Sequence, residues 1–368
     1  ASVLLVDYSC ALKLSTPLAV LAAMKEGVGR GVLVKGGRFL ESLAAADAVV
    51  FDKTGTLTES RPRVAEVIPG EGYERDDILR TAACLEEHFP HPVARAVVRK
   101  AEQEGLHHQE EHTEVEYVVA HGIASRLHGK RVLFGSRHYI HHDEGVPVDA
   151  MREDIERLAR EGRSILYLAV DGKLAGLIAI EDPLRPEAAP VIRKLLGRGI
   201  RVVMLTGDDE RTAAAVAERL GISEYRSQVL PTDKAEVIRS LQAEGHTVAM
   251  LGDGINDSPA LSAADVGVTL SDGADLAREV ADVVLTECRL DGLVTAVDLS
   301  KAAMRRIRTD FGLIMTLNTV FLASGLAGFL QPGPSALLHN LTTVGVSLNA
   351  MRPMLKAGAE LQLEEVSA

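Results

Sequence analysis

The sequence is poor in the residues that mark a disulfide framework, a zinc knuckle or a nucleic-acid-binding surface. Its three cysteines lie far apart and form no Cys-x-x-Cys pair, so no disulfide framework or zinc knuckle follows from them, and a reducing compartment is the simpler interpretation. Acidic residues outnumber basic ones, 52 to 40, and the net charge of −12 argues against a nucleic-acid partner. The sequence shows no secretory signal, internal repeat or low-complexity tract.

The segment Asp52–Thr58 also lacks a residue that matters for its chemistry. It follows an apolar run, Ala48–Phe51, that predicts a buried strand, so Asp52 stands at a strand end and is well placed to attack a phosphorus atom. Phosphatases of the haloacid-dehalogenase type usually carry a second aspartate two residues after the nucleophile, as general acid and base, and here that position is Thr54. Because threonine activates water poorly, an aspartyl-phosphate is expected to persist, which suits an enzyme that couples phosphorylation to a conformational cycle.

Strands and helices alternate in two separated parts of the chain, residues 47–60 and 176–292. The alternation predicts an α/β fold with a doubly wound parallel sheet of the haloacid-dehalogenase type, and Leu177–Ile180 is where it is expected to resume. Residues 61–175 have a different pattern of short strands and helices, with a hairpin turn at Gly129-Lys130. They predict an inserted α+β domain.

Polar residues at the ends of the predicted parallel strands form a candidate phosphoryl-transfer site. Ligands of such sheets bind beyond the carboxyl ends of the strands, where Asp52, Thr206 and Asp253 lie. Phosphoryl transfer requires positioning and charge neutralisation, so we expect Asp52 to be the nucleophile, Thr206 to hydrogen-bond a phosphoryl oxygen and Lys234 to neutralise its charge. Asp52, Asp253 and the backbone carbonyl of Thr54 offer the oxygen ligands that suit Mg²⁺.

The motifs Asp52–Thr58, Thr206–Asp208 and Gly252–Pro259 together resemble the signature of the P-type ATPases, and Asp182–Arg185 is similar to the hinge motif of that family. The resemblance covers nearly the whole chain. It implies that the parallel sheet belongs to a phosphorylation domain and that the insertion binds ATP. The residues of these motifs that we expect near the nucleotide, besides Thr54, are Gly207, Asp208 and Asn256.

Within the insertion, the chain resembles the heavy-metal-transporting branch of that family. Glu86 and His91-Pro92 look like the glutamate and the His-Pro pair that hold the adenine end of ATP in that branch. Gly122 stands where the branch has the second glycine of a Gly-x-Gly turn, although Ala120 replaces the first glycine. Ser136 follows Gly135 where Gly-Asn is common. These departures concern the details of nucleotide contact.

Three stretches are expected to be membrane spans: residues 1–24, 311–330 and 335–352, with a turn at 331–334. Basic residues follow the first span and flank the other two. By the positive-inside rule the stalk segments 25–46 and 293–310 and the tail 353–368 are expected in the cytoplasm. This topology predicts that upstream spans are missing from the chain. The alternative for the last two spans is a buried core hairpin of a soluble protein.

The first predicted span resembles the metal-site helix of heavy-metal pumps. Ser9 replaces its usual proline, and Cys10 keeps the metal-binding thiol. One thiolate with oxygen and nitrogen ligands favours Zn²⁺ or another divalent first-row ion over Cu⁺. Asn318, His339 and Asn340 in the other spans are further candidate ligands. Two alternatives stay open: an interfacial histidine at 339, and an interhelical hydrogen bond from Asn318.

The sequence therefore predicts the C-terminal part of a P-type ATPase that exports a transition-metal cation. It is expected to be a multi-pass protein of the plasma membrane, with membrane lipid, the transported ion and the missing N-terminal part of the pump as partners. One alternative is a soluble phosphatase or phosphotransferase of the haloacid-dehalogenase type, against which Thr54 and the apolar hairpin argue. Another is a nucleotide-binding remnant without transport, because the dephosphorylation loop of the family, Thr-Gly-Glu, is not found in this sequence.

Overall fold

The computed structural model describes residues 8–59, 61–87, 92–106, 112–118, 122–253 and 255–355. The chain divides into two compact units. The first unit comprises Ala1–Val49, Lys194–Arg201 and Ala235–Ala368, and the second comprises Val50–Arg193 and Val202–Lys234. Each unit is built from segments that are distant in the sequence.

A seven-stranded sheet has the strand order β1-β13-β12-β11-β2-β9-β10. Its strands are β1 (Val32–Val34), β2 (Ala48–Asp52), β9 (Arg201–Leu205), β10 (Glu224–Arg226), β11 (Val248–Leu251), β12 (Val266–Leu270) and β13 (Val283–Leu285). Strands β11, β12 and β13 pair in parallel, as do β9 and β10, while β1 pairs antiparallel with β13. The α/β prediction is confirmed, and β2 is buried along its whole length, as an apolar run in a parallel sheet should be.

The helices that alternate with these strands are α2 (Gly37–Ala45), α6 (Ala188–Leu196), α7 (Glu210–Leu220), α8 (Pro231–Ala243), α9 (Ser258–Ala263) and α10 (Asp275–Val280). Helix α7 shows how local chemistry sets their ends. The Asp209 side chain accepts hydrogen bonds from the backbone N–H groups of Arg211 and Thr212, which otherwise have no partner in the first turn. At the other end Gly221 adopts φ 73°, a left-handed conformation that glycine reaches without strain.

A separate six-stranded antiparallel sheet has the order β3-β8-β7-β6-β5-β4. Its strands are β3 (Arg63–Pro69), β4 (His112–Val118), β5 (Gly122–Leu127), β6 (Lys130–Gly135), β7 (Ser164–Val170) and β8 (Lys173–Glu181). The expectation that Leu177–Ile180 resumes the parallel sheet is wrong, because these residues pair with β3 and β7. The hairpin turn likewise lies at His128-Gly129, and Lys130 already belongs to β6.

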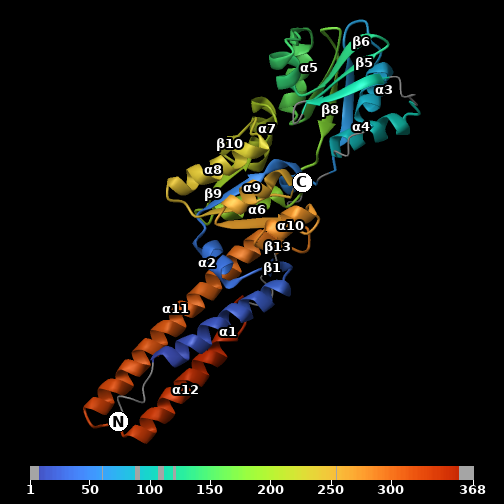
Figure 1. Cartoon of the computed structure of the whole chain (residues 1–368). Helices are drawn as coiled ribbons and strands as arrows, with labels where there is room; N and C mark the ends of the chain where they lie inside the picture. Colours follow the sequence, from blue (N-terminus) through green and yellow to red (C-terminus); the bar gives the residue numbers. More distant parts are fainter. Residues whose placement is uncertain are drawn as a thin grey trace, which may run out of the picture. The chain divides into compact units, whose positions relative to one another are not determined.

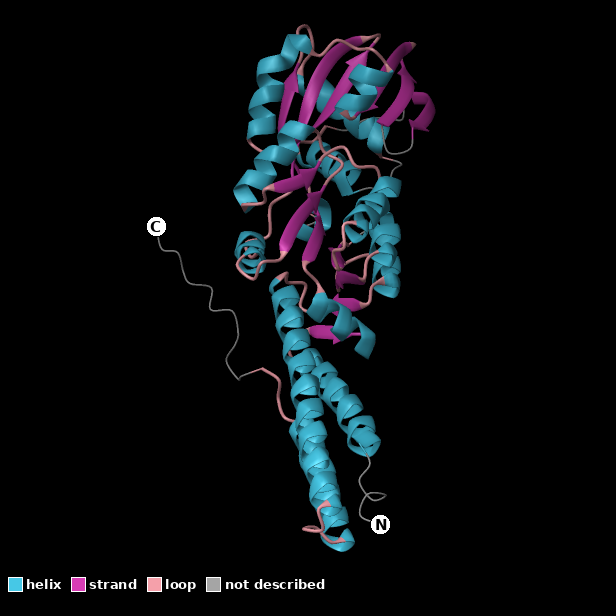
Figure 2. Ribbon diagram, turned by 90° about the vertical axis from the view of Figure 1, so that its left-hand side faces the viewer, coloured by secondary structure: helices cyan, strands magenta, loops and turns pink. Residues whose placement is uncertain are grey.

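This antiparallel sheet is covered on both faces by helices (Figure 2). Helices α3 (Arg75–Glu86) and α4 (Pro92–Gln103) share one apolar core with Val132 and Phe134, whereas α5 (Arg152–Arg160) shares another with Leu133. Successive residues of β6 therefore point to opposite faces, which is the strand periodicity of two. Both faces of the sheet are therefore buried, and the two apolar cores stabilise the predicted inserted domain.

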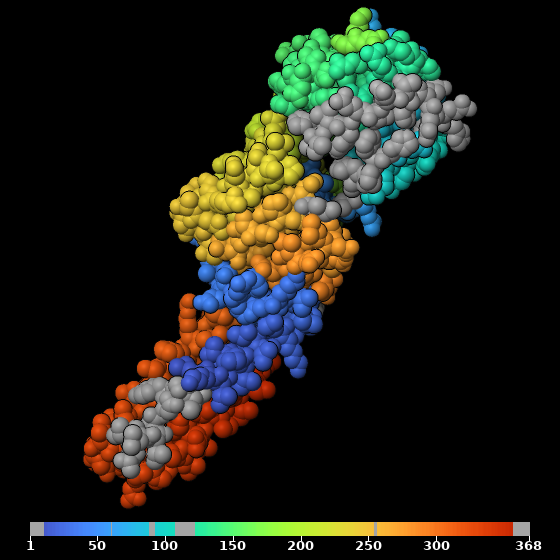
Figure 3. All heavy atoms as spheres, viewed as in Figure 1, coloured from blue at the N-terminus to red at the C-terminus, as the bar shows by residue number. Residues whose placement is uncertain are grey.

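Three long helices, α1 (Tyr8–Val28), α11 (Asp291–Leu326) and α12 (Pro332–Ala350), lie side by side in the first unit (Figures 1 and 3). Among the described helices, α11 is the one whose length and composition would let it cross a membrane. The predicted turn at 331–334 is wrong, since α11 ends at Leu326 and α12 already begins at Pro332. Proline is favourable in a first helical turn, because its missing N–H would have no intrahelical partner there.

Candidate phosphorylation and nucleotide site

The loop after β2 is shaped so that it buries the aspartate and exposes the residue two positions later. Asp52 is 5% exposed, while Thr54 is exposed. Gly55 adopts φ 78°, which a residue with a side chain rarely reaches, and its N–H donates to Thr58 Oγ1 at 2.8 Å. The glycine between the two threonines is thus required by the turn that carries Asp52.

Asp52 forms a buried ion pair with Lys234. The distance from Lys234 Nζ to Asp52 Oδ1 is 2.6 Å, and the two residues are 7% and 5% exposed. Lys234 lies in the first turn of α8, which begins at Pro231. The structure therefore brings together the predicted nucleophile and the predicted charge-neutralising lysine across 182 residues of sequence.

A second buried ion pair joins Lys53 to Asp208. Asp208 also accepts hydrogen bonds from Ser164 Oγ at 2.8 Å and from Thr206 Oγ1 at 3.0 Å. Burial alone would raise the pKa of the Asp208 carboxyl, but the charge and hydrogen bond of Lys53 outweigh it and hold that pKa below its usual value. Burial would likewise lower the pKa of Lys53, and Asp208 raises it instead. Both groups are therefore charged at neutral pH.

Ser164 and Arg185 are functional candidates that the sequence analysis missed. Ser164 is the first residue of β7 in the inserted sheet, and its hydroxyl lies 3.5 Å from Lys53 Nζ as well as contacting Asp208. Arg185, 9% exposed, donates from Nε to the carbonyls of Thr56 and Thr58, both at 3.0 Å, and from its terminal nitrogen to that of Gly55 at 3.2 Å. Arg185 could have been proposed from the sequence, because it belongs to the predicted hinge motif. Ser164 could not, because a single serine at the start of a strand indicates no function.

The aspartate of the predicted hinge motif contacts the loop after β2, residues 53–58, which is the predicted phosphorylation loop. Asp182 accepts a hydrogen bond from Thr58 Oγ1 and one from the backbone N–H of Arg61 at 3.2 Å. Burial raises the pKa of the Asp182 carboxyl, although the hydrogen bond from Thr58 opposes that shift. The hinge motif therefore contacts the loop at its side chains as well as through the bridge between Thr58 and Leu184.

The loop after β11 carries the second set of carboxylates. Gly252 is needed there because a Cβ would lie 2.7 Å from Cβ of Asp257. The carbonyl of Asp253 accepts a hydrogen bond from Ala274 N at 2.8 Å, and Asn256 is exposed. Asp253 and Asp257 both belong to this segment of the chain, and Asp257 is 2% exposed. Carboxylate oxygens are ligands that suit Mg²⁺.

In the inserted unit, which is the predicted inserted domain at residues 61–175, Glu86 lies at the C-terminal end of α3, beside a hollow of about 210 Å³. Burial raises the pKa of the Glu86 carboxyl to about 7. Gly122, at the start of β5, is closely packed, since a Cβ there would lie 2.5 Å from the Phe134 carbonyl oxygen and from the Tyr139 ring. His91 lies outside the described residues. Gly207 stands in open space, with Val229 O the nearest atom at 3.9 Å from a built Cβ.

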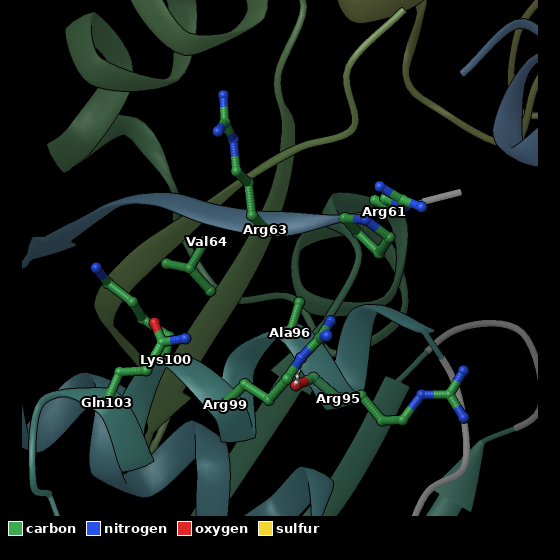
Figure 4. Close-up of a pocket in the computed structure, with 9 residues that line it drawn as sticks. Arg61, Arg63, Val64, Arg95, Ala96, Arg99, Lys100 and Gln103 are labelled. Atoms are coloured by element: carbon green, nitrogen blue, oxygen red, sulfur yellow. Dashed lines mark hydrogen bonds between the residues drawn. The ribbon is translucent and has the colours of Figure 1, made fainter. Parts of the chain in front are cut away.

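A larger cavity of about 550 Å³ lies between β3 and α4 of the same unit (Figure 4). Its lining is Arg61, Pro62, Arg63, Val64, Arg95, Ala96, Arg99, Lys100 and Gln103. Arg95 and Arg99 also line the hollow beside Glu86, so the two spaces adjoin. The planar guanidinium group of arginine can donate two parallel hydrogen bonds to phosphate oxygens. The lining of this cavity is therefore suited to phosphate, and it is basic although the chain as a whole has a net charge of −12.

The candidate ligands for a transported ion lie on the long helices. Ser9 and Cys10 belong to α1, but their side chains are outside the described part. Asn318 and His339 are 0% and 6% exposed, and His339 Nδ1 lies 3.3 Å from Asn318 Oδ1. The structure thus brings these two together between α11 and α12, while Asn340 is exposed.

The chain is similar to several known proteins. The family model for haloacid dehalogenase-like hydrolases matches residues 46–265. A zinc-exporting P-type ATPase of Mycobacterium marinum is 43% identical over 95% of this chain and 48% of its own length, and a manganese-exporting P-type ATPase of Mycobacterium bovis is 42% identical over 95% and 49%. A crystal structure of a zinc-transporting PIB-type ATPase in the E2.Pi state has a TM-score of 0.70 and 36% identity over 94% of this chain and 56% of that one.

The buried aspartate at the end of β2, its paired lysine and the matching family model define the class. The chain belongs to the haloacid dehalogenase-like hydrolases, and its relatives within that class are heavy-metal P-type ATPases, which are ATP-hydrolysing enzymes. The chain spans about half the length of the curated relatives it matches.

We predict that the stability of the Glu86→Gln variant relative to the parent increases as pH rises. Between about pH 4.5 and 7 the folded protein keeps a proton on Glu86 that the unfolded chain has lost. The free energy of unfolding of the parent therefore falls as pH rises through that window, and above it the parent bears the full cost of burying the Glu86 carboxylate. Glutamine is neutral throughout and has no such penalty. Urea unfolding of both proteins at pH 5 and pH 8 measures the difference. An equal difference at the two pH values would contradict the prediction.

We also predict that Ser164→Ala slows the proposed phosphorylation of Asp52 from ATP by about tenfold, because it removes the hydrogen bond that positions Asp208 and its ion pair with Lys53, the neighbour of Asp52. The initial rate of acid-stable labelling from γ-labelled ATP measures the effect. Glu156→Gln is the matched control, since it breaks only the exposed ion pair of 3.1 Å between Glu156 on α5 and Arg211 on α7 and should change the rate less than about twofold. A parental rate in Ser164→Ala would show that the bond does not matter.

Proposed function

We propose that this chain is the catalytic and ion-binding part of a pump that uses ATP to export a divalent transition-metal cation through an aspartyl-phosphate. The observation that carries the proposal is the buried pair of Asp52 and Lys234 at a strand end, with Thr54 where a hydrolysing enzyme would have its acid-base aspartate. The same chain contains an apolar helix long enough to cross a membrane. Thr54 and this helix, and not the Asp52–Lys234 pair, argue against a soluble phosphatase of the haloacid-dehalogenase type.

Phosphoryl transfer would proceed by attack of an Asp52 carboxylate oxygen on the γ-phosphorus of ATP. A bond forms between that oxygen and phosphorus, the bond from phosphorus to the oxygen bridging to the β-phosphate breaks, and its electron pair leaves with ADP. Lys234 is close enough to Asp52 to neutralise the transferred group. Thr206, which is 2% exposed and hydrogen-bonded to Asp208, is the proposed donor to a phosphoryl oxygen.

The donor set suits Mg²⁺. Asp52 and Asp253 each offer a carboxylate, and a hard divalent cation prefers oxygen ligands. We propose that Asp52, Asp253 and the carbonyl of Thr54 hold the ion, as expected from the sequence. When bound, Mg²⁺ neutralises charge on the phosphate oxygens.

We propose that ATP binds in the inserted unit with its adenine near Glu86 and His91. The adjoining basic cavity, about 550 Å³ in volume, supports a polyanionic ligand in this unit. Gly122, Gly207, Asp208 and Asn256 remain proposed contacts. The ion pair of Asp208 with Lys53 and its hydrogen bond from Ser164 would couple the nucleotide-binding sheet to the phosphorylation loop.

The proposed location is the plasma membrane, as a multi-pass protein with its catalytic domains in the cytoplasm. Large apolar side chains are exposed along the long helices, including Leu14, Phe311, Val320, Leu337 and Leu348 at 54%, 48%, 53%, 60% and 61%. Apolar surface of this extent suits lipid, and membrane lipid and the remainder of the pump are the proposed partners.

For the transported ion we propose Zn²⁺ or another divalent first-row cation, bound by Cys10 with Ser9, Asn318, His339 and Asn340 as candidate ligands. A lone thiolate offers Cu⁺ too few soft ligands. The buried contact between Asn318 and His339 supports the part of this set that faces the helix interface.

The test is metal-stimulated ATP hydrolysis by the full-length protein that carries this chain, reconstituted in lipid vesicles. Zn²⁺ or another divalent first-row ion should stimulate hydrolysis and accumulate in inside-out vesicles, Cu⁺ should do so poorly, and Cys10→Ser should remove both effects. Strong activation by Cu⁺, or full activity of Cys10→Ser, would overturn the proposed ion site. Phosphorylation of Asp52 without any transport would instead favour a nucleotide-using remnant.

A further inference from the structure

Helices α11 and α12 are joined by buried polar contacts at two levels. At one level Asn318 meets His339, as described above. At the other, Asn349 Nδ2 donates to Asp310 Oδ1 at 2.7 Å, and Asp310 is only 2% exposed. The second level lies nearer the start of α11. The sequence predicts Asp310 as the last residue of the stalk segment 293–310.

An apolar layer separates the two levels. Ala11, Ile314 and Val346 form a buried cluster, at 0%, 0% and 2% exposure, with one residue from each of the three long helices. Ile314 lies one helical turn after Asp310 and one turn before Asn318 on α11. At 1.5 Å per residue the two polar levels are about 12 Å apart along the helix.

The pairing of α1 with α11 brings a further hydroxyl to the level of Asp310. Ala11 clusters with Ile314, and a Cβ on Gly27 would lie 3.2 Å from Leu299 Cδ2, so the two helices run antiparallel in one constant register. In that register Ser15, one turn after Ala11, stands at the level of Asp310, one turn before Ile314. Ser15 is 2% exposed.

The carboxylate of Asp310 is incompletely satisfied. Its Oδ2 atom is buried and has no hydrogen-bond donor within the described part of the chain. Arg308 is exposed, and Arg306, one helical turn before Asp310 on α11, is directed elsewhere: its guanidinium donates to the backbone carbonyl of Asn349 and, at 3.4 Å, to that of Pro353. A buried carboxylate destabilises the fold when only one of its oxygens accepts a hydrogen bond, unless a cation or a proton neutralises its charge.

We propose that Asp310, oriented by Asn349 and with Ser15 at the same level of α1, is a second cation-binding position on the stalk side of the apolar layer. This inference rests on the proposed function and adds to it a position that the transported ion occupies before it passes the Ala11–Ile314–Val346 layer. The donors are carboxylate, amide and hydroxyl oxygens, so the position takes divalent cations such as Mn²⁺, Co²⁺ or Zn²⁺ and excludes Cu⁺.

Cobalt binding to the full chain in detergent micelles tests the proposal, because Co²⁺ reports a thiolate ligand by its charge-transfer absorption. Equilibrium dialysis counts total Co²⁺, and the part of the thiolate absorption that Cys10→Ser removes counts Co²⁺ on Cys10. We expect Asp310→Asn to lose one equivalent, or to bind it at least tenfold more weakly, while the thiolate absorption stays at its parental level. Asp310→Glu, which keeps the carboxylate, should retain the equivalent. Asp298→Asn, an exposed acid of the same helix that pairs with Arg198 at 2.7 Å, should match the parent.

The outcomes separate this inference from the proposed function. Parental Co²⁺ binding by Asp310→Asn, with the thiolate absorption present, would overturn the second position, leave the Cys10 site standing and make Asp310 a protonated hydrogen-bond partner of Asn349. Absence of Co²⁺ binding by the parent would overturn both. If Asp310→Asn loses helical content, Ser15→Ala decides, since it should weaken the same equivalent several-fold and leave the absorption unchanged; an unaltered isotherm would refute the proposal.

Discussion

Replacing Asp52 by asparagine is expected to reduce acid-stable labelling from γ-labelled ATP to background. The amide has the same shape as the carboxylate but no anionic oxygen to form the acyl-phosphate bond, so no covalent intermediate can accumulate. ATP binding should be largely retained, because Glu86 and the basic cavity belong to the inserted sheet with its helices and do not depend on the charge of Asp52. Labelling measures the chemical step and calorimetry with ATP measures binding.

A matched control for this variant is Asp275→Asn, whose side chain is 93% exposed. It makes the same chemical change on the surface and should label at the parental rate. Asp52→Glu should also fail, because one additional methylene moves the oxygen away from its position beside Lys234. Undiminished labelling of Asp52→Asn would show that the phosphorylated residue is another one.

Replacing Lys234 by methionine is expected to lower the rate of Asp52 phosphorylation by about 10²–10³-fold, the usual effect of removing one preorganised charge-stabilising donor. The variant keeps the apolar stem of the side chain and removes only the ammonium that lies 2.6 Å from Asp52. It also leaves the buried Asp52 carboxylate without this countercharge, so we expect a lower urea midpoint for unfolding as well. Single-turnover labelling and urea titration of the same samples separate the two effects.

Lys173→Met serves as the control for that prediction, because Lys173 is exposed at the start of β8. Its rate and its urea midpoint should both match the parent. A Lys234→Met rate within about threefold of the parent would mean that Lys234 stabilises the fold around Asp52 without contributing to phosphoryl transfer.

The catalytic strand and its loop could be predicted because their signals are local. An apolar run followed by Asp52 and a glycine specifies a buried strand and a turn wherever the rest of the chain lies, and β2 ends at Asp52 as expected. The prediction for Leu177–Ile180 failed because it depended on which strands these residues pair with, which is not a local property of the sequence. A short apolar run does not say whether its partners are parallel or antiparallel, and here the partners are β3 and β7.

The hinge and the start of the last helix show two further limits. A motif at Asp182–Arg185 could be predicted, but only the folded chain directs the Arg185 guanidinium to carbonyl groups of the loop 129 residues earlier. Pro332 was interpreted as part of a turn, whereas it opens α12. Proline suits both a turn and the first turn of a helix, so the residue alone cannot decide between them.

By itself, the sequence determined which groups are available for chemistry: an aspartate at a strand end, no aspartate two residues later, a distant lysine and acidic loop, and an apolar stretch at 311–330 of the length a bilayer requires. Only the tertiary structure decided which residues from distant parts of the chain contact one another. Ser164 with Asp208, Arg185 with the phosphorylation loop, and Asp310 with Asn349 are pairs separated by tens of residues or more. Periodicity and motif spacing report only neighbours along the chain, whereas burial and hydrogen bonding between distant segments depend on how helices and sheets pack.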